Sequence, residues 1–109
     1  MAELDRVLHI AEIPYEGGET RFRYERYLAP DQTKWIRHGL FRAFYVNGQL
    51  ATEGLYVHGG EVGMWRDFHE NGQPAAEGAY EDGKRTGLWK FYDESGQLQN
   101  EEIADGTMD

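Results

Sequence analysis

From residue 39 onward, apolar and polar side chains alternate in short runs separated by turns that contain glycine. Each run opens with a glycine, a variable residue and an aromatic residue, at 39–41, 63–65 and 87–89. Each then reaches a turn of Asn-Gly-Gln or Ser-Gly-Gln, at 47–49, 71–73 and 95–97. A period of two predicts strands, and a small residue followed by glycine between two such runs predicts a β-hairpin. The pattern therefore predicts three hairpins, spaced 24 residues apart.

The turns also predict how the strands pair. If Asn47 and Gly48 are the centre of a two-residue type I′ turn, both have positive φ, and the paired residue numbers are fixed. The three turns then place a basic residue opposite a glutamate, in the pairs Arg42–Glu53, Arg66–Glu77 and Lys90–Glu101. Because facing opposite charges are a favourable cross-strand pair, the three pairs support this register.

On the other predicted face, aromatic rings stand opposite strand glycines. Phe41 faces Gly54 and Trp65 faces Gly78, so each ring can cover backbone that would otherwise contact water. The third unit has Glu102 where the first two have this glycine. Loss of a repeat residue in the last unit is typical of the terminal unit of a repeat array.

Residues 1–38 follow the pattern less closely. An apolar run from residue 6 to residue 13, a turn at 14–18 and an alternating run at 19–28 predict a diverged hairpin that caps the open end of the sheet. A loop at 29–33 follows. A short helix over Glu3–Ala11 is the alternative.

Residues 39–109 hold the three repeats, joined by short links at 58–62 and 82–86. Short links between successive hairpins favour a meander. The sequence therefore predicts a single all-β domain, an elongated twisted antiparallel sheet of stacked β-hairpins.

The repeated string, nearly complete from Gly63 to Gly87, resembles the MORN-repeat variant found in bacterial proteins; it reads Gly-x-Trp-x-x-Phe/Tyr-x-x-Asn-Gly-Gln-x-x-x-Glu-Gly-x-Tyr-x-x-Gly-x-x-x-Gly. The likeness covers about two thirds of the chain. It implies stacked β-hairpins and kinship with small proteins of the YwqK type. These are described as antitoxins or immunity proteins, which neutralise a toxin by binding it.

Composition narrows the classes of function. A net charge of −9 opposes binding to nucleic acid and to anionic lipid, and it favours basic partners. We find no signal-peptide pattern and no run long enough to span a membrane, so the default expectation is a soluble cytoplasmic protein. There is no cysteine, and the four histidines do not have metal-ligand spacing. We therefore predict no metal, no cofactor and no catalytic residues.

The aromatic residues of the second face have two interpretations. They form either the core between repeats or a partly exposed strip that binds a partner, because a single sheet cannot bury both faces. The predicted partner-binding residues are Phe41, Tyr45, Tyr56, Trp65, His69, Tyr80 and Trp89. The leading hypothesis is a non-catalytic protein-binding module, an antitoxin or immunity protein whose partner is a basic toxin. The alternative is a scaffolding repeat protein that self-associates through its sheet edges.

Overall fold

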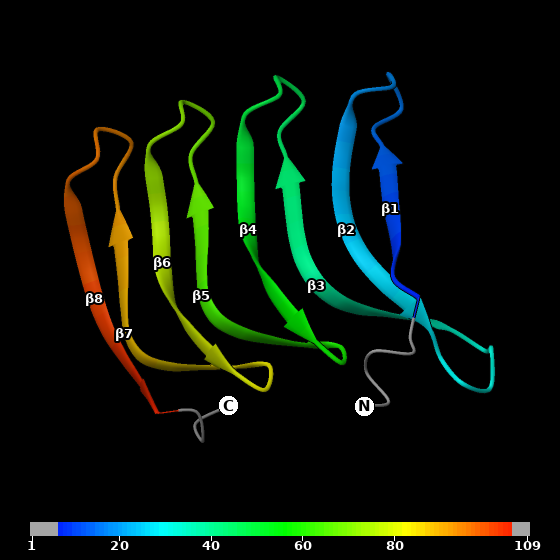
Figure 1. Cartoon of the computed structure of the whole chain (residues 1–109). Helices are drawn as coiled ribbons and strands as arrows, with labels where there is room; N and C mark the ends of the chain where they lie inside the picture. The colour runs from blue at the N-terminus through cyan, green and yellow to red at the C-terminus, as the bar shows by residue number, and fades with distance from the viewer. Residues whose placement is uncertain (1–6, 106–109) are drawn as a thin grey trace.

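A computed structural model describes residues 7–105, which form one open antiparallel sheet of eight strands (Figure 1). The strands lie side by side in chain order, so each pairs only with its neighbours in the sequence. Their bounds are β1 His9–Pro14, β2 Thr20–Leu28, β3 Trp35–Phe44, β4 Leu50–Val57, β5 Gly60–Phe68, β6 Pro74–Glu81, β7 Lys84–Tyr92 and β8 Leu98–Asp105. The predicted all-β sheet of stacked β-hairpins is confirmed. The described residues span 45 × 39 × 21 Å, so the sheet is nearly as wide as it is long.

The turn within each hairpin differs from the prediction. The backbone N–H of Gly48 donates to the carbonyl of Tyr45, and the N–H of Tyr45 donates to the carbonyl of Gln49, both at 2.9 Å. Gly48 has a φ of 91°, whereas Asn47 does not have positive φ. The type I′ prediction is therefore wrong. The loop has three residues and ends in a glycine that forms a bulge, a common alternative in hairpins.

The predicted register is nevertheless confirmed, because the bulge between Ala43 and Phe44 shifts the pairing back by one residue. All three predicted charge pairs are cross-strand partners. They belong to one row that crosses every strand, which we call the ion ladder; its members are Glu12, Arg23, Arg42, Glu53, Arg66, Glu77, Lys90 and Glu101. Apart from the neighbours Arg23 and Arg42, its charges alternate in sign.

The links between hairpins are tighter than predicted. At the β4–β5 link, His58 and Gly59 have φ values of 48° and 93°, and Val57 pairs with Gly60. The equivalent residues of the β6–β7 link, Asp82 and Gly83, have φ values of 52° and 87°. Positive φ at two successive residues is the type I′ geometry. The predicted five-residue links are therefore wrong, since strand pairing continues up to two-residue turns.

The glycine that opens each repeat marks a bend. Gly39, Gly63 and Gly87 have φ values of 112°, 70° and 71°. At Gly63 the pairing of β5 with β4 shifts, because Glu53 pairs with Arg66 but Leu55 pairs with Val62. Figure 1 shows β3, β5 and β7 curving strongly toward the end at which the links lie. The repeat keeps glycine here because residues with a Cβ rarely adopt positive φ.

Gly63→Ala is expected to lower the free energy of unfolding by about 1–2 kcal/mol, the usual cost of left-handed backbone for an L-residue. An added Cβ would meet no atom within 4 Å, so the cost comes from the backbone alone. Gly60→Ala is the control, because Gly60 does not have positive φ and its added Cβ would have no neighbour nearer than 3.5 Å. Urea unfolding of both variants measures the difference; equal losses would contradict the assignment.

The first hairpin, β1 with β2, is built like the other three. The N–H of Gly18 donates to the carbonyl of Tyr15 at 3.0 Å, the N–H of Tyr15 donates to the carbonyl of Glu19 at 2.7 Å, and Gly18 has a φ of 103°. The alternative helix is wrong for residues 9–11, which begin β1; residues 3–6 lie outside the described part of the chain. The difference from the repeats is the longer loop between β2 and β3.

Candidate partner-binding surfaces

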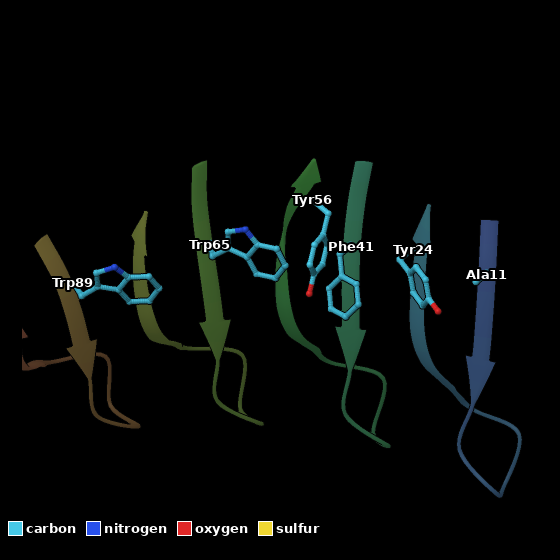
Figure 2. Packing of buried hydrophobic residues seen from close by; sticks show 6 residues of the cluster. All are labelled: Ala11, Tyr24, Phe41, Tyr56, Trp65 and Trp89. Carbon is cyan, nitrogen blue, oxygen red and sulfur yellow. The ribbon is translucent and has the colours of Figure 1, made fainter. Parts of the chain in front are cut away.

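One face of the sheet, the inner face, carries a row of aromatic rings, of which Figure 2 draws all but the one on β6. Each strand from β2 to β7 contributes one ring to this aromatic row, which consists of Tyr24, Phe41, Tyr56, Trp65, Tyr80 and Trp89. Centroids of successive rings lie 5.2–5.9 Å apart, and most pairs meet edge to face. This is the favourable range for aromatic pairs, so the row links all four hairpins.

Each tryptophan of the row covers a glycine of the preceding hairpin. A Cβ built on Gly54 of β4 would lie 2.1 Å from Cδ2 of Trp65 on β5. A Cβ on Gly78 would lie 2.2 Å from the same atom of Trp89. Trp65 does pair with Gly78 as predicted, but its ring lies over Gly54 instead. The expectation that each ring covers the glycine opposite it in its own hairpin is therefore corrected.

The indole N–H groups fix this arrangement. That of Trp65 donates to the carbonyl of Leu55, and that of Trp89 donates to the carbonyl of Ala79, both at 3.1 Å. Both acceptors belong to the preceding hairpin. The same rule explains why the last hairpin has Glu102 in place of this glycine. No described strand lies beyond β8 to place a ring over that position.

Burial separates the seven predicted partner-binding residues into two groups. Phe41, Tyr56, Trp65 and Trp89 expose only 7%, 9%, 6% and 2% of their surface. A residue so covered offers little area to a partner, which supports the core interpretation for these four. The other three, Tyr45, His69 and Tyr80, are half-buried. Contact of the seven residues with a partner stays a prediction.

Tyr45 and His69 tie successive hairpins together near their turns. The hydroxyl of Tyr45 donates to the carbonyl of Phe68 at 2.5 Å, and Nε2 of His69 lies 2.9 Å from the carbonyl oxygen of Tyr92. Tyr15 makes the equivalent bond from the first hairpin to the second. Burial, and then the nearby carboxylate of Glu70, raise the pKa of Tyr45.

In the last hairpin the equivalent position is Asp93. Its carboxylate accepts hydrogen bonds from its own turn, including one from the hydroxyl of Ser95 at 2.7 Å and one from the backbone N–H of Gln97 at 2.9 Å. These bonds hold the pKa of Asp93 below its usual value. The position therefore links hairpins where another hairpin follows and stabilises the turn in the last unit.

The opposite, outer face carries the ion ladder and, beside it, a row of exposed aliphatic side chains. We call this the aliphatic row; it consists of Ile10, Leu40, Leu55, Met64, Leu88 and Ile103, with exposures of 57%, 38%, 48%, 57%, 44% and 77%. A shallow hollow of about 260 Å³ lies between the two rows, lined in part by Leu55, Met64 and Arg66. An extended exposed apolar surface of this kind is typical of interaction sites.

The aliphatic row was not predicted from the sequence, although its signal is present. The variable residue of the Gly-x-aromatic pattern is Leu40, Met64 or Leu88, which is aliphatic in every repeat. Strand alternation puts this residue on the face opposite the aromatic ring that follows it. The repeat therefore specifies an apolar residue on each face, one buried and one exposed.

Two histidines that are 20 residues apart meet at the open end of the β3–β4 pair. The rings of His38 and His58 have centroids 4.5 Å apart, and the backbone N–H of His58 donates to Nδ1 of His38 at 3.0 Å. The hydroxyl of Tyr27 lies 2.7 Å from Nδ1 of His58. Within residues 7–105, no cluster of three or more histidine, cysteine or acidic side chains has an arrangement that suits a metal ion. Sequence spacing alone did not reveal this contact.

The ring of Tyr56 contacts a cation. Tyr56 lies below the guanidinium of Arg37, whose carbon is 5.5 Å from the ring centroid, and Nη1 of Arg37 donates to the tyrosine hydroxyl at 3.3 Å. Burial raises the pKa of Tyr56, and the hydrogen bond from Arg37 opposes that shift. The arrangement favours a neutral tyrosine held under a cation, which is a structural contact.

Comparison with protein families agrees with the hairpin boundaries. A family model described as the MORN repeat variant matches residues 37–58, 61–84 and 85–103, which together make up more than half of the chain. The chain belongs to this family. MORN repeats are non-catalytic modules that in general bind proteins or membranes. The three matches fall on the hairpins β3–β4, β5–β6 and β7–β8.

The β1–β2 hairpin has the turn geometry of a MORN repeat without a family match of its own. Comparisons with curated proteins and with solved structures gave no match. Within the described range, no helix has the length and apolar character needed to cross a bilayer.

Proposed function

We propose that this MORN-repeat protein is a non-catalytic binding module that holds a partner protein against the outer face of its sheet. The observation that carries the proposal is the aliphatic row. Its six side chains stay 38–77% exposed although the aromatic row of the inner face is largely buried. Covering such side chains on binding contributes about 25 cal/mol per Å² of apolar surface, before the entropy cost of association.

In its finer form, the proposal is an antitoxin or immunity role in the cytoplasm, in which direct binding neutralises a basic toxin. Charge supports this choice of partner. Residues 60–109 carry 12 of the 20 acidic residues but only 4 of the 11 basic ones, so one half of the chain holds almost all of the net charge. A field of this sign attracts cationic surfaces and repels nucleic acid.

The experiment is affinity capture with the full chain and paired variants. The products of neighbouring genes are co-expressed with the wild-type protein and with the double variant Met64→Asp/Leu88→Asp. Because both side chains are exposed, the variant should fold, and a captured partner should bind it at least tenfold more weakly, as for interface hot spots. Val46→Asp is the control, since Val46 is also exposed but lies in a hairpin turn.

Equal affinity of the double variant and the wild type would overturn the outer face as the binding surface. In that case the exposed parts of Tyr45, His69 and Tyr80 are the surface to test next. Growth assays test the finer proposal. A captured partner that arrests growth by itself and not in the presence of this protein supports the antitoxin role, and a harmless partner contradicts it.

A further inference from the structure

The described sheet has two edges, β1 and β8, and they differ in protection. Strand β1 has six residues and ends in Pro14, which has no backbone N–H. Strand β8 has eight residues, with the sequence LQNEEIAD, and contains neither proline nor lysine. Natural sheets usually protect their edges with short strands, proline or charged side chains, above all lysine. The charged side chains of β8 are all acidic, so they repel an acidic strand and attract a basic one. Edge β8 therefore offers a longer row of backbone groups, which no described strand pairs on its outer side.

The ion ladder is incomplete at this edge. Each interior glutamate has a basic residue on both sides, as Glu77 has in Arg66 and Lys90. Glu101 has only Lys90, because β8 is the last described strand. Opposite charges that face each other across strands are stabilising. A strand added beyond β8 would continue the ladder if it placed a cation opposite Glu101.

The inner face of β8 also favours a basic residue on an added strand. Gly54 and Gly78 accept the ring of a following tryptophan, and Glu102 occupies the equivalent position. A bulky ring is disfavoured on top of a glutamate side chain, whereas a Lys or Arg beside it gains an ion pair. The next outer-face residue, Ile103, is 77% exposed and suits an aliphatic neighbour.

A second copy of this chain fits the edge poorly. If copies were added head to tail with the ladder in register, Glu12 of one copy would stand opposite Glu101 of the other. Like charges directly opposite each other are destabilising, so the ladder disfavours self-association in this mode. A basic segment would instead face Glu101 and Glu102 of β8 with the opposite charge.

We propose that strand β8 binds an extended basic segment of a partner protein, which adds to the sheet as a ninth strand. The segment runs antiparallel to β8 and carries an aliphatic residue beside Ile103, followed by two adjacent Lys or Arg residues at the level of Glu102 and Glu101. This inference rests on the proposed function, since it names the chemistry of the partner. Its backbone hydrogen bonds supply affinity and its side chains supply specificity, as in other cases of strand addition.

The probe is a synthetic peptide of residues 84–92 with Trp89→Lys, which presents Leu-Lys-Lys in the required order. Fluorescence anisotropy measures its binding to the full chain, and amide hydrogen exchange locates it. We expect slower exchange confined to β8, and affinity that decreases as salt increases. A peptide with Trp89→Glu and Lys90→Glu should not bind.

Protein variants separate the edge from the rest of the molecule. Glu101→Gln and Glu102→Gln should each weaken peptide binding by up to about fivefold, the value of one exposed cross-strand pair. Glu12→Gln is the matched control at the other end of the ladder and should leave the affinity unchanged. Melting temperatures confirm that the variants are folded.

Absence of binding, protection outside β8, or an equal effect of Glu12→Gln would overturn the inference. Its failure is distinguishable from that of the proposed function. Suppose that binding of a captured partner depends on Met64 and Leu88 but is unchanged by Glu101→Gln and Glu102→Gln. This result would support binding at the outer face and contradict binding at the β8 edge.

Discussion

Replacing Gly54 by alanine is expected to lower the free energy of unfolding by about 2–3 kcal/mol, the upper part of the range for overpacking. The added Cβ would lie 2.1 Å from Cδ2 of Trp65, nearer than real Cβ atoms approach other heavy atoms. The ring has little freedom to withdraw, because its N–H donates to the carbonyl of Leu55. Gly54 does not have positive φ, so the loss reports ring contact and not backbone strain.

Urea unfolding followed by circular dichroism measures this loss. Gly78→Ala should behave alike, since its Cβ would meet Trp89 at 2.2 Å. Glu102→Ala is the matched control at the equivalent position of the last hairpin, and we expect a change within about 0.5 kcal/mol, as for exposed substitutions. An effect at Gly54 no larger than at Glu102 would mean that Trp65 does not rest on Gly54.

Trp65→Ala is expected to cost about 3–5 kcal/mol, the usual range for truncating a buried tryptophan. The ring is 6% exposed, contacts Tyr56 and Tyr80 on either side, and covers the backbone of the preceding hairpin. A domain of this size is typically stable by about 5–15 kcal/mol, so the loss is a large fraction of the total. In a repeat array it also weakens the coupling between neighbouring units.

Trp35→Ala is the control for this variant, because Trp35 is 43% exposed and contacts mainly His9 and Arg26. We expect it to cost about 1 kcal/mol, the usual value of an exposed cation–π contact. Both variants are compared by urea unfolding, with the slope of the transition as a second readout. A lower slope for Trp65→Ala would indicate that the hairpins on either side of Trp65 unfold separately. Equal losses for Trp35 and Trp65 would contradict the core role of the aromatic row.

Strand pairing could be predicted from the sequence although the turn type could not. An Asn-Gly pair fits both a two-residue turn and a three-residue turn with a bulge. The facing charges of Arg42 and Glu53 favour the observed register, and the three-residue loop reaches it because the bulge between Ala43 and Phe44 shifts the pairing by one residue. The tight turns lie instead at His58–Gly59 and Asp82–Gly83. Short links with one obligatory glycine gave little indication of which geometry they adopt.

The candidate surfaces could be predicted only in part. A period of 24 residues places Trp65 beside both Gly54 and Gly78, and only the side-chain direction decides which glycine it covers. Pattern alone therefore could not distinguish a buried row from an exposed one. The aliphatic row could have been predicted from the sequence, because Met64 and its equivalents alternate with the aromatic residues along each strand. The contact between His38 and His58 depends on the exact path of the links.

Both tryptophans of the aromatic row, Trp65 and Trp89, lie over the glycine of the hairpin before them, which buries the inner face and leaves the outer face and the β8 edge for binding. Nuclear Overhauser contacts between the indole protons and the glycine Hα protons test this directly. We expect contacts of Trp65 with Gly54 and of Trp89 with Gly78, with the Hα resonances of both glycines shifted upfield by the rings. Contacts of the Trp65 ring with Gly78, and none with Gly54, would contradict this arrangement.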